Sequence, residues 1–327
     1  MQRFSIIIPV FNRPQELKEL LESLSCQTYK NFEVIIVEDG SSLKADKVVE
    51  DFKEKLEIRY YYKPNSGQGF SRNYGYERAS GDYFIVFDSD CLIPEIYLEL
   101  VNRSLNINYL DAYGGPDREH ASFSPVQKAI SYAMTSIFST GGIRGGKKRV
   151  GIFHPRSFNM GISRQVFEET GGYILPKMGE DLELSIRIIK KGFKVGLIPE
   201  AFVFHKRRTS FNRFFQQLHF FGRARINVFR HYPNELKITH FFPAIVVLSV
   251  LISVLLLFFN FTLFAIAVAC FFFYSLLLIV DASIKNKSIL IGFLSLFAVY
   301  TMLFGYGIGF ITEGVRQLIH PKKGVSN

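Results

Sequence analysis

Apolar and polar residues follow one another along the first 210 residues in a pattern that predicts strands and helices in turn. Short apolar runs typical of buried strands occupy 5–10, 32–37, 58–62, 83–87 and 201–204. Apolar residues at helical spacing predict helices at 14–24, 43–56 and 68–79. Strands that alternate with helices build a mainly parallel, doubly wound sheet, so we expect an α/β domain.

The last third of the chain differs, because it contains two long stretches without any charged residue. No Asp, Glu, Lys or Arg occurs from Ile238 to Val280, or from Ser288 to Thr312. About 20 apolar residues in a helix cross a hydrocarbon core of about 30 Å. We therefore predict three membrane segments, at about 241–259, 262–280 and 288–312. Core helices of a soluble protein are the alternative, but they are rarely so long and so closely spaced.

Positive charge, a formal +10 overall, is concentrated just before these segments. Basic clusters lie between Arg144 and Arg156 and between Lys206 and Lys237. Such clusters attract anionic lipid head groups by about 1 kcal/mol per charge. Residues 210–232 mix phenylalanines with arginines, as an interfacial helix would, although an ordinary packed helix is the alternative. We expect membrane lipids as partners and no nucleic acid, since no recognition motif accompanies the charge.

The topology is expected to keep the amino-terminal domain in the cytoplasm. The apolar run at 4–10 is too short for a signal peptide, and the basic clusters favour the inner side of the membrane. We therefore expect a multi-pass protein of the inner (plasma) membrane. Three full spans would place Arg316, Lys322 and Lys323 outside, against the positive-inside tendency. A re-entrant third segment or a tolerated tail would remove that conflict.

Two other sequence features bear on ligands. The glycine-rich, basic stretch 141–151 is interpreted as a loop that could order over a ligand. Cys26, Cys91 and Cys270 lie far apart in the sequence, which argues against a disulfide framework and against a zinc site.

Acidic residues follow two of the predicted strands. Asp88 and Asp90 come directly after the run at 84–87, where their oxygens suit Mg²⁺ or Mn²⁺ and thereby a diphosphate. Asp39 ends the second strand, where a carboxylate can accept hydrogen bonds from a base or a ribose. A simple turn is the alternative at both places, and a helix cap is a further one at Asp39.

A third acidic pair and a histidine complete the candidate chemistry. Glu180 and Asp181 open a predicted helix, where the helix dipole stabilises acids without any function. An ionised acid near an acceptor hydroxyl is also what an inverting sugar transfer needs as general base. His205 follows the strand at 201–204, either as a structural residue or as a third metal ligand.

These motifs, in this order, resemble family 2 of the inverting glycosyltransferases with the GT-A fold, over about residues 3–210. The matching segments are 5–12, 37–41, 65–73, 88–90 and 179–181. Glu38 is a mild departure, because this family usually has two aspartates there. The resemblance implies nucleotide- and donor-binding roles for Pro9, Phe11, Asn12, Asp39, Asn65, Gly67, Arg72, Asn73, Asp88 and Ser89.

The same resemblance implies the catalytic and metal-binding residues. Asp181 would be the catalytic base, with Glu180 beside it, and Mn²⁺ or Mg²⁺ would be held by Asp90, Asp88 and His205. The implied domains are a GT-A (Rossmann-like) catalytic domain at 1–209, basic and aromatic interfacial helices at 210–240, and a membrane domain at 241–327 that ends in a short basic tail.

The expected reaction is transfer of a sugar with inversion from a nucleotide-sugar donor, with uracil as the base that the resemblance favours. A lipid-linked saccharide is the expected acceptor, since a soluble acceptor gives no reason for membrane attachment. A nucleotidyltransferase is one rival, but residues 9–14 contain no glycine-rich phosphate loop. A non-catalytic membrane scaffold is the other, although it would be expected to lose the acids at the strand ends.

Overall fold

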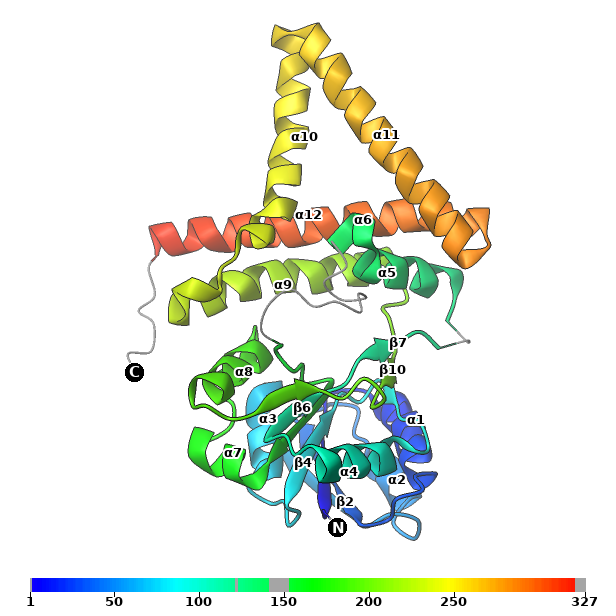
Figure 1. Ribbon diagram of the computed structural model, residues 1–327, viewed down its shortest axis with the longest axis vertical. Coiled ribbons are helices and arrows are strands. Elements are labelled where there is room, and N and C mark those ends of the chain that lie inside the picture. The colour runs from blue at the N-terminus through cyan, green and yellow to red at the C-terminus, as the bar shows by residue number, and fades with distance from the viewer. Residues whose placement is uncertain (1, 121–122, 141–152, 321–327) are drawn as a thin grey trace. The chain divides into compact units, whose positions relative to one another are not determined.

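The computed structural model describes residues 2–120, 123–140 and 153–320, so the predicted loop at 141–151 lies outside the described residues. The described chain forms two units (Figure 1). The first contains the residues up to His120 and those from 153 to Lys206. The second contains α5 (Pro125–Thr135), α6 (Ile137–Thr140) and the chain from Arg207 onward.

A seven-stranded sheet with the order β3-β2-β1-β4-β8-β6-β9 forms the frame of the first unit. Its strands are β1 (Phe4–Val10), β2 (Phe32–Asp39), β3 (Ile58–Lys63), β4 (Tyr83–Phe87), β6 (Ala112–Gly114), β8 (Asn159–Ser163) and β9 (Val195–Leu197). The parallel arrangement predicted from the sequence holds for β1 to β4. β8 runs antiparallel to both β4 and β6, so the sheet as a whole is mixed.

Helices cover both faces of this sheet. Ile6 and Ile8 of β1 belong to one core cluster and Ile7 to the other, because successive side chains of a strand point to opposite faces. The first cluster includes residues of α1 (Pro14–Ser25), α2 (Asp46–Glu50) and α4 (Tyr97–Ile107). The second includes residues of α3 (Gln68–Tyr76), α7 (Arg164–Thr170) and α8 (Glu180–Lys190). Burial on both faces explains why the strands are continuous apolar runs.

The helix predicted at 43–56 is wrong in its extent. Only α2 is helical, and the residues after it form turns. The amide of Phe52 donates to the carbonyl of Val49 at 3.1 Å, a three-residue spacing that is tighter than an α-helix. Phe52 and Leu56 are still buried, so their apolar spacing reflects core contacts made from turns.

A second, small sheet brings a late segment of the chain to the end of β4. It contains β5 (Cys91–Leu92), β10 (Val203–His205) and β7 (Asp117–Arg118), in that order. His205 pairs antiparallel with Cys91, so the histidine lies next to the residue that follows Asp90. The small sheet, and not the seven-stranded sheet, brings His205 and Asp90 together.

The second unit contains the long helices. After α9 (Phe211–His231) come the 3₁₀ turns η1 (Pro233–Glu235) and η2 (Ile238–Phe241), then α10 (Phe242–Phe259), α11 (Phe261–Asn286) and α12 (Ile289–Ile319). Three segments are long and apolar enough to cross a membrane, with mean hydropathies of 2.9, 2.8 and 2.0, which confirms the predicted apolar helices. The predicted turn at Asn260 is present, and its side chain caps α11. The predicted polar link at 281–287 is mostly helical, because α11 continues to Asn286.

Candidate functional site

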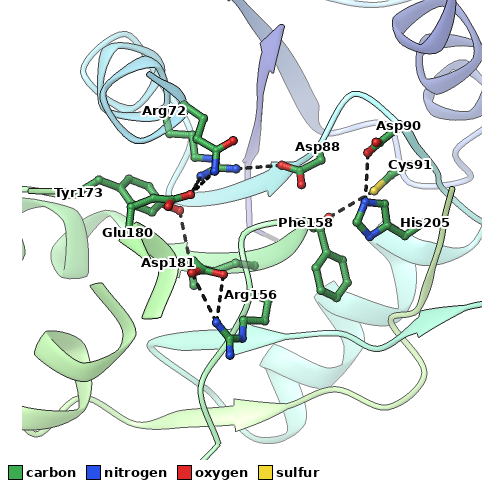
Figure 2. Close-up of polar contacts among 12 residues, drawn as sticks. Arg72, Asp88, Asp90, Cys91, Arg156, Phe158, Tyr173, Glu180, Asp181 and His205 are labelled. Carbon is green, nitrogen blue, oxygen red and sulfur yellow. Dashed lines mark hydrogen bonds and ion pairs between the residues drawn. The ribbon is translucent and has the colours of Figure 1, made fainter. Parts of the chain in front are cut away.

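Asp90 lies at the centre of a polar cluster just beyond β4 (Figure 2). One carboxylate oxygen lies 3.1 Å from Nε2 of His205, and the other forms an ion pair with Arg13. The Sγ atom of Cys91 and the ligand atoms of Asp90 and His205 all lie within 4.8 Å of one another. The His205 ring also stacks on Phe158, with 5.0 Å between ring centroids. The small sheet therefore assembles a set of ligand atoms around Asp90.

The chemistry of this cluster fits a divalent cation. Burial alone would raise the pKa of the Asp90 carboxyl, but His205 and Arg13 hold that pKa well below its usual range. A carboxylate and an imidazole are ligands that Mn²⁺ accepts. Burial raises the pKa of the Cys91 thiol, which lies 3.6 Å from the carbonyl oxygen of Phe158. Because a neutral thiol is a weak metal ligand, the carboxylate oxygen of Asp90 and the imidazole nitrogen of His205 are the stronger ligand atoms of the group.

Arg72 connects the end of β4 to the start of α8. Its guanidinium is 1% exposed and forms ion pairs with Asp88 at 2.8 Å and with Glu180 at 3.1 Å. Burial opposes the charged form, but the neighbouring Tyr173, Asp88 and Glu180 raise the pKa of Arg72. In Figure 2, Asp88 lies between the Arg72–Glu180 pair and the Asp90–His205 pair. Arg72 thus fixes Asp88 at the edge of the sheet where the acids meet.

We expect Arg72→Met to lower the free energy of unfolding by about 3–5 kcal/mol, because it leaves Glu180 buried without its cation. The measurement is urea unfolding of the detergent-purified full chain, followed by circular dichroism. Lys53→Met is the matched control, since Lys53 forms an exposed pair with Glu50 and should change stability by less than about 1 kcal/mol. Equal effects of the two substitutions would contradict this role of Arg72.

The two acids that open α8 have different surroundings. Glu180 is 3% exposed and accepts hydrogen bonds from Gln68 and Arg72. Burial and then the charge of Asp181 raise the pKa of Glu180. The Asp181 side chain is 21% exposed, with Arg156 at 3.4 Å. Asp181 is therefore the more accessible of the two acids, and Glu180 is bound within the fold.

Asp39 organises the loop that precedes α3. Its carboxylate accepts hydrogen bonds from the amides of Ser66 and Gly67, both at 2.9 Å, and forms an ion pair with Lys63. The Asn65 side chain donates to the Asp39 carbonyl at 2.8 Å. Gly67 has a φ of 92°, which favours glycine at this position. Asp39 from the segment 37–41 and Asn65 and Gly67 from the segment 65–73 thus form one hydrogen-bonded structure.

We expect Asp39→Asn to lower the free energy of unfolding by about 2–3 kcal/mol at pH 7. Burial would raise the pKa of Asp39, but Lys63 and the Ser66 amide lower it below its usual value. A lowered pKa stabilises the fold above the unfolded value of about 3.9, and this contribution is lost as the pH falls through the folded pKa. Urea unfolding at pH 7 and at pH 3 should show the difference between the two proteins shrinking at low pH. A difference that does not change with pH would contradict this account.

Two asparagines that were predicted to bind the donor make contacts within the fold. Asn12 accepts hydrogen bonds from the Leu43 amide at 2.9 Å and from the Ser42 hydroxyl at 3.1 Å. Asn73 donates to the Tyr173 carbonyl and accepts from the Tyr173 amide, both at 2.8 Å. Asn12 joins the segment after β1 to the segment after β2, and Asn73 joins α3 to the segment between α7 and α8. Their contribution to a donor pocket would therefore be indirect.

The other predicted residues at the strand ends differ in exposure. Pro9 lies within β1 opposite Val37, and Ser89 is buried between Asp88 and Asp90. Phe11 is 51% exposed after β1, a position from which its ring can meet a ligand. Glu38 is fully buried and accepts hydrogen bonds from the Ala45 amide and the Tyr60 hydroxyl. Glu38, which stands where the family usually has an aspartate, therefore has a structural role.

The sequence did not predict several partners of these acids, namely Arg13, Lys63, Gln68, Cys91 and Arg156. Arg13 directly follows the matched segment 5–12, at the end of the first predicted strand. Its position near the acidic residues after the neighbouring strand could therefore have been predicted from the sequence. The remaining partners come from segments whose positions depend on the tertiary fold.

A family model described as glycosyl transferase family 2 matches residues 5–171. The chain belongs to glycosyl transferase family 2. The matched part contains Asp39, Asp88 and Asp90, whereas Asp181 and His205 lie beyond it.

Relatives and a solved structure agree with this membership in family 2. An uncharacterized glycosyltransferase of Rickettsia felis is 37% identical over 106 residues, which cover 32% of this chain and 18% of that protein. A glucuronosyltransferase of Methanococcus voltae, named for a dolichyl N-acetylglucosaminyl phosphate substrate, is 26% identical over 79% of this chain and 84% of its own length. The mannosyltransferase PcManGT of Pyrobaculum calidifontis, solved with GDP-Man and Mn²⁺, has a TM-score of 0.60 at 15% identity, covering 98% of this chain and 88% of that one. This structural similarity shows the GT-A type of fold.

The chain spans less than a third of the length of the first curated relatives that it matches, with 18%, 15% and 32% of those proteins covered.

Proposed function

We propose that this protein transfers a sugar, with inversion, from a nucleotide-sugar donor to a lipid-linked saccharide at the cytoplasmic face of a membrane. The main observation behind the proposal is that one unit holds three aspartates at two neighbouring places, the end of β4 and the start of α8. Asp88 and Asp90 follow the central strand β4, and Asp181 lies at the start of α8, which Arg72 joins to Asp88 through Glu180. A sugar transfer by a single displacement needs one group of acids that binds the donor through a metal ion and a separate acid that acts as general base.

The metal in this proposal is Mn²⁺ or Mg²⁺, held by Asp90 and His205 with Asp88 beside them. When bound, such an ion supplies positive charge for the diphosphate leaving group. The presence of Mn²⁺ in the structurally similar mannosyltransferase supports this choice. Arg13, paired with Asp90, is a second positive group beside the same position.

Asp181 acts as the general base of the proposed reaction. Its carboxylate takes the proton from the acceptor hydroxyl while that oxygen attacks the anomeric carbon of the donor. The bond between the anomeric carbon and the diphosphate oxygen breaks in the same step, so the configuration inverts. Arg156 forms an ion pair with Asp181 at 3.4 Å, and the Asp181 side chain remains 21% exposed.

Two findings support the proposed partners. The Methanococcus voltae relative is named for a dolichyl-phosphate-linked saccharide, and this chain has helices apolar enough to enter a membrane. The donor base has two candidates, because the family resemblance favours uracil and the similar mannosyltransferase holds GDP-Man.

The test is calorimetric titration of the detergent-purified full chain with UDP and with GDP, each with and without Mn²⁺. We expect one nucleotide to bind only with the metal, and Asp90→Ala to abolish that binding. Asp46→Ala, which removes an exposed acid on α2, is the control and should bind as the wild type does. Binding of neither nucleotide in the presence of Mn²⁺ would contradict the donor site.

A further inference from the structure

We propose that α12 does not cross the membrane and instead lies along its surface, paired with α9, while α10 and α11 form the spanning hairpin. This proposal concerns the second unit alone and does not depend on the proposed sugar transfer. The partner of the α9–α12 pair is a bilayer surface that carries anionic head groups.

Close packing joins α9 and α12 along several turns (Figure 1). A Cβ atom added at Gly305 would lie 3.0 Å from the Phe215 carbonyl oxygen, and one at Gly309 would lie 2.1 Å from that of His219. One turn further, Arg223 forms an ion pair with Glu313 at 2.9 Å. A side chain at either glycine would push the helices apart, so the two helices are held as one pair.

The contacts also give the direction of the two helices. Residues 215, 219 and 223 of α9 meet residues 305, 309 and 313 of α12, so the numbers rise together along both helices. The helices therefore run parallel, and in Figure 1 both run from the same side of the second unit to the other.

This parallel pairing conflicts with a spanning α12. Consecutive spans cross in alternating directions, so if α9, α10, α11 and α12 all spanned, α12 would run opposite to α9. If only α10, α11 and α12 spanned, α9 would lie outside the hydrocarbon and could not line α12 over several turns. The observed pair is compatible with α10 and α11 as the spans and with both α9 and α12 at the surface.

The charges on α9 support the same arrangement. Its sequence contains four arginines, Arg213, Arg223, Arg225 and Arg230. Arginines near the centre of a bilayer are costly, whereas at a surface they meet anionic lipid. A spanning α12 would draw this basic helix into the hydrocarbon along with it.

Burial separates α12 from the other two apolar helices. In the most apolar window of each segment, 44% of the residues are buried for α12, against 11% for the segment with α10 and 6% for α11. α5 packs against the first half of α12, where Ala129 and Ile130 share a core cluster with Ala298 and Val299. Protein contacts therefore account for more of the apolar surface of α12 than of α10 or α11.

The remaining exposed side chains match a bilayer surface. Apolar side chains near the start of α12 are exposed, namely Ile289, Leu290, Phe293 and Phe297. Basic side chains are exposed on α9, on the link after it and at the end of α12, namely Arg213, Lys237 and Arg316. The first group suits acyl chains and the second suits anionic head groups. A surface α12 also keeps Arg316 on the inner side, in accord with the positive-inside tendency.

Cysteine accessibility tests this topology. Each full-length variant keeps one accessible cysteine: native Cys26 in the first unit, Thr262→Cys at the hairpin tip, or Val315→Cys on α12. Cys270→Ala is present in all three, and Cys26→Ser in the last two. Buried Cys91 is retained, and its lack of labelling before denaturation reports a folded protein. A membrane-impermeant maleimide is added to intact spheroplasts and, separately, to inverted vesicles.

We expect residue 262 to label only in spheroplasts, and residues 26 and 315 to label only in inverted vesicles, each by at least tenfold over the opposite preparation. Labelling of residue 315 together with residue 262 in spheroplasts would show that α12 spans and would overturn the inference. Labelling of all three residues only in inverted vesicles would overturn the spanning hairpin.

Discussion

Asp90→Asn is expected to lower the rate of donor turnover by about 10³-fold, which corresponds to about 4 kcal/mol of transition-state stabilisation. Asparagine keeps the size of the side chain but loses the negative charge that His205 and Arg13 surround. The metal would then be held by the imidazole and by the more distant Asp88 alone. The measurement is release of nucleoside diphosphate at increasing Mn²⁺ concentration.

The matched control for this substitution is Asp46→Asn, because Asp46 is an exposed acid on α2 outside the polar cluster. It should keep turnover within about twofold of the wild type, in line with the small effects of surface changes. If Asp90→Asn kept normal turnover and the normal Mn²⁺ dependence, Asp90 would not be a metal ligand.

Asp181→Asn is expected to lower kcat by about 10²–10⁴-fold, the usual contribution of a general base, with donor affinity unchanged. An amide cannot take the proton from the acceptor hydroxyl, and Asp181 contacts neither Asp90 nor His205 among the contacts described here. Kinetics with saturating donor gives kcat, and calorimetry gives the affinity for the nucleotide.

Glu180→Gln separates the role of the neighbouring acid from that of Asp181. Glu180 is buried against Arg72 and Gln68, so the substitution should act mainly on stability and only weakly on kcat. A larger loss of kcat for Glu180→Gln than for Asp181→Asn would exchange the roles of the two acids. Equal loss of donor binding in both variants would show that neither residue is a specific base.

The sheet and the edge where the acids meet could be predicted from the sequence for a physical reason. Strands covered on both faces need continuous apolar runs, and polar residues directly after such runs lie at one edge. Asp39, Asp88 and Asp90 were found in this way. The turns at 51–56 were mistaken for helix because Phe52 and Leu56 keep an apolar spacing that turns also satisfy.

Contacts that depend on packing could not be derived from the pattern of apolar and polar residues. The place of His205 beside Asp90 was expected from the family resemblance alone, because a strand pairing between segments more than 100 residues apart makes this contact. Arg156, which reaches Asp181 from another loop, was not predicted. α12 is the sharpest case, because by length and composition alone it could cross a membrane. Its parallel packing on the arginine-bearing α9 and its greater burial, which support the proposed surface position, appear in the three-dimensional structure and not in the composition.

The most direct test of the central claim is transfer of labelled sugar into membrane lipid. Membranes that contain the wild-type chain or Asp181→Asn at equal abundance are incubated with Mn²⁺ and a panel of radiolabelled UDP- and GDP-sugars, and lipids are extracted into organic solvent. We predict that one donor labels the lipid fraction with the wild type, and that the label falls at least about 100-fold with the variant. Equal labelling by the two proteins, or none with any donor, would contradict sugar transfer to a lipid-linked acceptor by this protein.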